Sequence, residues 1–168
     1  GDAAVVADRE SNEVLLISVC GKMPCTQGTR ENPNPVARFR SHDGGETWTA
    51  YEDITEDIYS IFDNRADAVR SIFFGSGRIC QSRLVKVKDY YRLYAALWTR
   101  DNGNRVLYSD DFGETWNTLG YEEFPAPSGN EPKCEELPDG TVVLSSRTGG
   151  GRFFNFFTFT DINKAEGK

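Results

Sequence analysis

The sequence predicts an all-β chain, and three observations support that class. Aromatic residues make up 12% of the 168 residues and glycine accounts for 16 of them, a composition suited to short strands joined by tight turns. Runs of helix-favouring residues are scarce. An eight-residue pattern, Ser-x-Asp-x-Gly-Glu-Thr-Trp, occurs twice, at residues 41–48 and 109–116, which indicates a repeated supersecondary unit.

The first unit is expected over residues 1–55. Two strands joined by a turn at 9–13 open it, and a loop over 25–35 separates them from a third strand. That third strand, at 36–43, alternates in polarity and runs into the first copy of the pattern, and a fourth strand leaves the copy. The polar stretch 55–71 that follows is expected to be irregular, with a short helical turn.

The second unit, expected over residues 70–120, repeats this order. Three strands separated by the turns Lys-Asp and Arg-Asp-Asn-Gly-Asn lead into the second copy, and a fourth strand leaves it. The third unit, over 128–168, has turns at Leu-Pro-Asp-Gly and Thr-Gly-Gly-Gly and is expected to be truncated. Its Asp161 takes the place of the pattern's aspartate, 50 residues after Asp111. The pattern thus falls between strands three and four of each unit.

A recurring unit of four antiparallel strands is the blade of a β-propeller. A β-sandwich is the alternative, but it gives no reason for one turn to recur at the same place in each unit. Propellers close with about four to eight blades, and three blades would leave sheet faces and edges uncovered. We therefore expect about three blades of one propeller domain, with the remaining blades supplied by a longer protein of which this chain is a part or a cleavage product.

Composition excludes several classes of partner. The formal net charge is −7 and the pI is about 4.8, and no Lys/Arg-rich run is present, so a nucleic-acid partner is not expected. No apolar run approaches the length of a membrane span. Because the overall charge opposes an anionic ligand, any anion site must be built locally from arginines.

The cysteines and the single histidine do not suggest a metal site. Cys20 and Cys25 are compatible with a small disulfide loop and equally with a free pair. Cys80 and Cys134 lie in strand-like segments and are expected to be buried small hydrophobic residues. No cofactor is expected.

The repeated pattern favours a structural turn. Ser41-His42-Asp43 has the letters of a hydrolytic triad, but adjacent residues do not converge on one substrate as triad members must. The second copy has aspartate where the first has histidine. Each aspartate can instead accept N–H groups of its own turn, while the serines tie the start of the turn. Gly45 and Gly113 are expected at positive φ. The two tryptophans, at 48 and 116, are expected to pack between sheets.

This pattern resembles the Asp box of sialidases (neuraminidases), a turn that some non-catalytic propellers also carry. The resemblance covers essentially the whole chain and is closest to the bacterial exo-α-sialidase type. It implies a six-bladed propeller in the full protein, of which this chain would supply roughly the second to fourth blades.

Residues 129–154 resemble the central sialidase segment, in which a glutamate on one strand is followed one hairpin later by an arginine. In that family three arginines grip the substrate carboxylate, a tyrosine is the nucleophile, a glutamate polarises it, and an aspartate is the acid/base. The resemblance matches Glu136 to the polarising glutamate and Arg152 to one arginine of the triad. Arg147 is the rival for that arginine, and Glu131 is a further carboxylate of the motif whose role stays open.

Three further residues match positions that line the substrate pocket in the family. Asp2 matches an Asn or Asp that hydrogen-bonds a sugar hydroxyl. Leu97 and Thr99 share one face of a strand and match pocket-lining positions loosely. Trp98, on the opposite face, is expected in the core.

The resemblance implies a retaining exo-α-sialidase that releases terminal sialic acids from glycoconjugates. The first and third arginines of the triad, the acid/base aspartate and the nucleophilic tyrosine have no counterpart here and are expected outside the chain. An extracellular or periplasmic location follows from the substrate. The alternative is a non-catalytic Asp-box propeller that binds a protein or a glycan.

Overall fold

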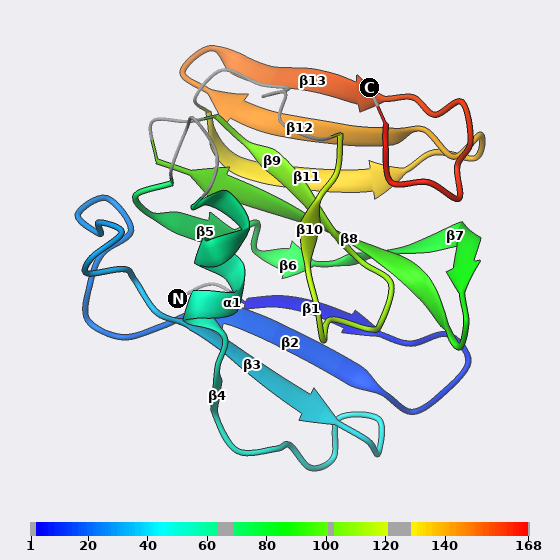
Figure 1. The fold of residues 1–168 in the computed structure, drawn as a ribbon, viewed down its shortest axis with the longest axis horizontal. Helices are drawn as coiled ribbons and strands as arrows, with labels where there is room; N and C mark the ends of the chain where they lie inside the picture. The colour runs from blue at the N-terminus through cyan, green and yellow to red at the C-terminus, as the bar shows by residue number, and fades with distance from the viewer. Residues whose placement is uncertain (1–2, 64–68, 101–102, 121–128, 168) are drawn as a thin grey trace.

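The structure is a computed structural model that describes residues 3–63, 69–100, 103–120 and 129–167 (Figure 1). Nearly all regular structure is β. The strands are β1 (Ala3–Ala7), β2 (Val14–Val19), β3 (Val36–Ser41), β4 (Glu52–Asp53), β5 (Ile72–Phe74), β6 (Gly77–Arg78), β7 (Cys80–Val87), β8 (Tyr90–Thr99), β9 (Arg105–Ser109), β10 (Asn117–Thr118), β11 (Asn130–Glu136), β12 (Val142–Thr148) and β13 (Gly151–Phe157). The helical pieces are α1 (Thr55–Tyr59) and the 3-10 turn η1 (Ser60–Phe62), within the stretch predicted to be irregular.

The strands form three sheets that follow one another along the chain. The first sheet has the order β4-β3-β2-β1-β6, with β6 joined to β1 in parallel; the second has the order β10-β9-β8-β5, with β7 also paired to β8; the third is β11-β12-β13. In Figure 1 the second sheet lies between the first, at the bottom, and the third, at the top. The prediction of an all-β, blade-like architecture is confirmed.

The second sheet has one strand more than the predicted four, because β8 is ten residues long. Its first half pairs with β7 and its last three residues pair with β5, so one long strand has two partners on the same side. No described helix is long and apolar enough to cross a membrane.

Two hydrophobic clusters fill the seams between the sheets. Since successive side chains of a strand point to opposite faces, β8 contributes to both clusters. Leu93, Ala95 and Leu97 enter the cluster shared with the first sheet, while Tyr94 and Ala96 enter the cluster shared with the third. The middle sheet therefore has a buried face on either side.

The two Asp-box turns have the same hydrogen bonds. In the first, the Ser41 hydroxyl donates to Asp43 at 2.7 Å and accepts from Gly45 N at 2.8 Å, while Thr47 donates through N at 2.9 Å and through its hydroxyl at 2.5 Å to the same carboxylate. The corresponding distances in the second turn are 2.8, 2.8, 2.9 and 2.6 Å. Gly45 and Gly113 have φ of 98° and 83°, so the structural interpretation of the pattern is confirmed.

These bonds act on the titration of the first box. Hydrogen bonds from the side chain and the amide of Thr47, and from Ser41, lower the pKa of Asp43 from 3.8 to about 2. Because the folded-state pKa lies below the unfolded one, the box contributes its stability fully above about pH 4 and loses it as the pH falls towards 2.

The variable second position of each box pairs with a residue near the start of the facing strand: Glu13, directly before β2, and Arg92, within β8. His42 Nδ1 lies 2.8 Å from Glu13 in the first sheet, and Arg92 Nε lies 2.6 Å from Asp110 in the second. In the first copy the box supplies the basic residue of the pair, and in the second copy it supplies the acidic residue. The two copies therefore share the contact although the residue types are exchanged. The exposed His42 is thus a partner of a structural carboxylate, as expected of a residue outside any triad.

Arginines of one sheet bind the box turn of the next. Arg38 donates to Gly113 O at 2.6 Å and to Glu114 O at 3.1 Å, and Arg40 donates to Phe112 O at 3.0 Å. Arg92 of the second sheet makes the same kind of contact with the turn after Asp161, through the carbonyl oxygens of residues 162 and 163 at 3.4 and 3.1 Å. The turns therefore fasten neighbouring sheets as well as their own strands.

The prediction for the tryptophans is confirmed for one and wrong for the other. Trp116 is 6% exposed and packs edge-on against Phe74, with ring centroids 6.2 Å apart, in the seam between the first and second sheets. Trp48, between β3 and β4, is 41% exposed, and its indole N–H donates to Gly45 O of its own turn. Whether a box tryptophan is buried depends on a sheet packed against it, which the local sequence does not encode.

We expect Arg38→Ala to lower the free energy of unfolding by about 2–4 kcal/mol, because one buried and one partly buried carbonyl group lose their donor. The Arg38 guanidinium also pairs with Glu52 at 2.6 and 2.8 Å, and its side chain is almost fully buried. The matched control is Arg30→Ala, which removes an equally double-paired but more exposed arginine, bound to Glu56 and Asp63, and should cost about 1 kcal/mol or less. Denaturant unfolding of both variants decides; equal losses would contradict the assignment.

Candidate active site

The site begins with three paired residues at one end of the third sheet, Asn130, Arg147 and Arg152, which we call the rung. Asn130 on β11 pairs with Arg147 on β12, and Arg147 pairs with Arg152 on β13. Glu131 Oε2 lies 3.0 Å from Arg147 Nε, and Glu131 O accepts a bond of 3.0 Å from Arg152 Nη2. The structure thus brings Glu131, Arg147 and Arg152 together.

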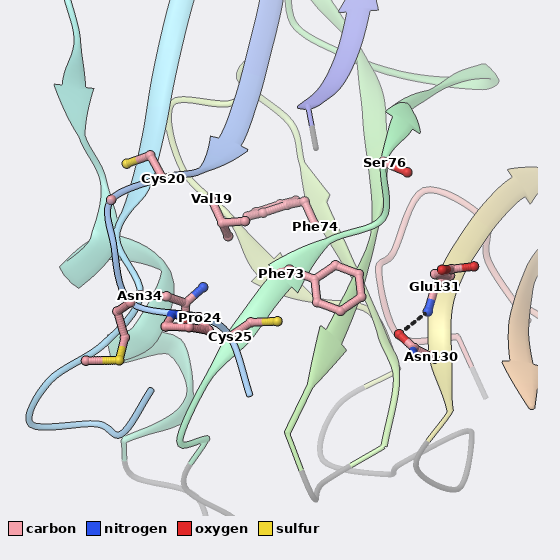
Figure 2. A pocket seen from close by; sticks show the side chains of 12 residues that line it. Val19, Cys20, Pro24, Cys25, Asn34, Phe73, Phe74, Ser76, Asn130 and Glu131 are labelled. Atoms are coloured by element: carbon pink, nitrogen blue, oxygen red, sulfur yellow. Dashed lines mark hydrogen bonds between the residues drawn. The ribbon is translucent and has the colours of Figure 1, made fainter. Parts of the chain in front are cut away.

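The backbone at Glu131 is strained. Its φ is +38°, which is uncommon for a residue with a side chain, and a β-bulge in the pairing of β11 with β12 lies between Asn130 and Lys133. The next residue is Pro132, which normally restricts its predecessor to extended conformations. The Asn130 side chain accepts a hydrogen bond of 2.9 Å from Glu131 N, as Figure 2 shows. Such strain, together with a bulge, is typical of functional sites.

A neighbouring loop supports this bulge. Gly75 follows β5 and donates to Ala96 O at 2.7 Å, and a Cβ atom at this glycine would collide with Pro132 O. Lys133 Nζ reaches Ser76 Oγ at 3.4 Å. The second sheet therefore holds the start of β11 through a backbone contact that requires glycine.

A cavity of about 340 Å³ opens beside Glu131 (Figure 2). Its walls come from the segment after β2, from β5 and the loop after it, and from the start of β11. They are mostly apolar, with a few polar groups: Val19, Cys20, Gly21, Met23, Pro24, Cys25, Asn34, Phe73, Phe74, Ser76, Asn130 and Glu131. A second cavity, of about 390 Å³, is lined by Gly129, Asn130, Arg147, Thr148 and Gly149, on the same rung. An apolar cavity with few convergent polar groups is the usual form of a small-molecule site.

The cysteines are free thiols in the structure. Cys20 and Cys25 both line the larger cavity, and Cys25 points towards Phe73 in Figure 2. Cys80 is buried as expected, and burial raises its pKa to about 12. Cys134 is only partly buried, against the core between the second and third sheets. No group of three or more potential metal ligands occurs in the described parts of the chain.

The structure separates Glu136 from Arg152. Glu136 lies at the opposite end of β11 from the strained rung, pairs with Val142, and is 4% exposed. Its carboxylate accepts bonds from Ser82 Oγ at 2.5 Å and Arg83 N at 2.6 Å. Glu136 thus joins the third sheet to β7, and it does not line the cavity beside Glu131.

We expect Glu136→Gln to lower the free energy of unfolding by about 1–3 kcal/mol, because a buried charged acceptor of two hydrogen bonds is replaced by an amide. Denaturant unfolding measures this loss. The proposed catalytic turnover of the folded fraction should stay within about twofold of the wild type, since a structural carboxylate contributes no transition-state interaction. A collapse of turnover with unchanged stability would restore Glu136 as a catalytic candidate.

Arg152 is a brace rather than an open binding group. Its Nε donates to Ser145 Oγ at 2.6 Å, and Nη2 donates to Ser145 O at 3.2 Å as well as to Glu131 O. Arg147 contacts Glu131 through Nε, and its terminal nitrogens make no hydrogen bond to the protein among the described residues. The side chains of Arg147 and Glu131 are 51% and 55% exposed. The two terminal nitrogens of the Arg147 guanidinium are therefore open to solvent.

The remaining predicted pocket residues do not line the cavity. Leu97 and Thr99 are fully buried: Leu97 in the core between the first and second sheets, Thr99 bonded to Gly103 O. Trp98, predicted for the core, is instead partly exposed and stacks on Phe73, with centroids 5.0 Å apart. The faces of β8 are exchanged relative to the prediction because its Leu97 face meets the first sheet. Asp2 lies outside the described residues.

Sequence reasoning did not rank Glu131 and Arg147 first, although one signal was present. A proline directly after the first residues of a strand marks an edge or a bulge, and Glu131 stands immediately before Pro132. A bulge re-aims its side chain, which strand periodicity alone cannot show.

Comparison with known proteins agrees with the fold and the turns. The BNR/Asp-box repeat matches residues 39–50 and 107–118. A sialidase from Paraclostridium sordellii is 30% identical over 123 residues, which are 70% of this chain and 28% of that protein. The chain therefore spans little more than a quarter of the length of this relative.

Solved structures share the arrangement of the sheets. A Hadza microbial sialidase has a TM-score of 0.68 at 21% identity, over 96% of this chain and 31% of the other. The intramolecular trans-sialidase from Ruminococcus gnavus has a TM-score of 0.53 at 22% identity, over 79% and 25% respectively. The two Asp boxes, the similarity in sequence to a sialidase and the sheet arrangement shared with solved sialidases together support a relationship of this chain to the sialidase family.

Proposed function

We propose that the protein containing this chain is a retaining exo-α-sialidase that releases terminal sialic acids from glycoconjugates. The observation that carries the proposal is the Glu131–Arg147 pair, held at a strained bulge beside an apolar cavity. These residues take the two roles that the family resemblance implies for this segment, in place of Glu136 and Arg152.

Arg147 would bind the substrate carboxylate. The two terminal nitrogens of a guanidinium can donate parallel bonds to the two oxygens of a carboxylate. In a chain with net charge −7, such a local donor is needed to overcome the unfavourable long-range field. Arg152 fixes the backbone of Glu131, so that the rung presents Arg147 in one orientation.

Glu131 would accept the proton of a nucleophilic tyrosine. A phenol is a weak nucleophile at neutral pH, and a carboxylate within hydrogen-bond reach activates it. In this structure the Glu131 carboxylate lies 3.0 Å from Arg147 Nε, at the edge of the cavity. The tyrosine, the acid/base aspartate and two further arginines would come from the remaining blades, in a six-bladed propeller.

The substrate suggests an extracellular or periplasmic location, where sialylated glycoconjugates are reached. The decisive experiment is hydrolysis of a fluorogenic sialoside by the intact protein, compared with the same fluorophore on a neutral sugar. Selective release from the sialoside supports the proposal. Binding of sialosides without turnover would instead favour the non-catalytic Asp-box propeller.

A further inference from the structure

Two fully buried polar side chains next to the site have no hydrogen-bond partner among the described residues. They are Asn104, directly before β9, and Ser146, directly before Arg147 on β12. Both amide atoms of Asn104, Nδ2 and Oδ1, and the hydroxyl of Ser146 are unsatisfied. Nearly all buried polar groups in native proteins have a partner, so three such atoms in one place call for an explanation.

The two side chains meet at Gly129. A Cβ atom on this glycine would lie 3.2 Å from Asn104 Nδ2 and 3.1 Å from the Ser146 Cβ. It would also lie 3.1 Å from Arg147 O. The junction therefore joins the start of β9 in the second sheet to the residues immediately before Asn130 and Arg147 in the third, and a Cβ atom at 129 would crowd it.

We propose that Asn104 and Ser146 bind one buried water molecule, and that through it they position the Asn130–Arg147 rung. A buried water typically makes two to four hydrogen bonds to otherwise unsatisfied groups. The amide supplies a donor and an acceptor, and the hydroxyl supplies either, so the two side chains suit one bridging water. Without this water, the Asn130–Arg147 pair would be held less firmly, and the Arg147 side chain would be less well positioned. The consequence for catalysis rests on the proposed function; the water site does not.

The water site is tested by stability in a double-mutant cycle. Asn104→Leu keeps the volume and removes the polar atoms, and Ser146→Ala removes the hydroxyl. If a water is bound, Asn104→Leu should lower the Tm of the intact protein by roughly 4 °C, and the double variant should fall no further, because the two residues share one ligand. Ser146→Thr, which keeps a hydroxyl, should restore part of the loss. A rise in Tm for Asn104→Leu, or strictly additive losses, would overturn the proposal.

The positioning role has its own readout. Asn104→Leu should lower kcat/KM for a sialoside by about tenfold, mainly through a higher KM, because the carboxylate-binding arginine is displaced. The matched control is Val106→Ala, which removes buried side-chain volume on β9. It should lower Tm and leave kcat/KM unchanged at 25 °C. Non-additive losses of Tm in the cycle, together with an unchanged KM for Asn104→Leu, would overturn the positioning role. Absence of sialoside turnover in the wild type would refute the proposed function while leaving the cycle to decide the water site.

Discussion

Glu131→Gln is expected to lower turnover of a fluorogenic sialoside by about 10²–10⁴-fold, because an amide cannot take the proton that a carboxylate takes in general-base catalysis. The effect should fall mainly on kcat, since the group acts on the nucleophile and not on the bound substrate. Glu135→Gln is the matched control: it lies on the same strand, and its carboxylate is 3.5 Å from Arg78, outside the strained rung. Turnover of Glu131→Gln within tenfold of the control would remove Glu131 from the proposed machinery.

At position 131 glycine should be more stabilising than alanine, which is the reverse of their usual order. At φ +38° a side chain is strained, whereas glycine is not. Glu131→Gly is therefore expected to be more stable than Glu131→Ala by about 1–3 kcal/mol in denaturant unfolding, although both should be inactive. Alanine more stable than glycine would mean that the backbone relaxes, and that the site is not held under strain.

Much of the architecture could be predicted from local sequence, because the serine, aspartate and threonine of each Asp box bond to one another. Ser41, Asp43 and Thr47 satisfy one another within a seven-residue turn, so the same letters at 109–115 give the same bonds. Strand periodicity then places three or four strands around each box. Because such turns are determined by local sequence, the strands that flank them can be predicted without knowing how the sheets pack.

The candidate site was harder to predict because it depends on register and on a distortion. Pairing of Val142 with Glu136 and of Arg147 with Arg152 places Glu136 on the face that meets β7 and Arg152 on the opposite face. Spacing alone made the two look like partners across a hairpin. The bulge at Glu131 adds one residue to β11 and changes which side chain meets Arg147.

Contacts between sheets were also beyond local sequence. The buried Arg38 and Arg92 are bound to box turns about 70 residues further along the chain, and nothing in their own strands indicates this use. Trp48 and Trp116 stand in the same eight-residue pattern and have different surroundings. In each case a neighbouring sheet decides the role of the side chain.

Arg147→Lys should lower kcat/KM for sialosides by about 10²-fold, largely through KM, because lysine offers a point charge where arginine offers a fork matched to a carboxylate. Stability should change little, since the Glu131–Arg147 pair is half exposed and such pairs contribute about 1 kcal/mol or less. Arg152→Lys is the matched control on the paired position of the next strand. Its Nε bond to Ser145 is lost, so we expect a modest loss of stability and a several-fold change in KM at most. A larger KM effect for Arg152→Lys than for Arg147→Lys would reverse the two roles and return the carboxylate-binding function to Arg152.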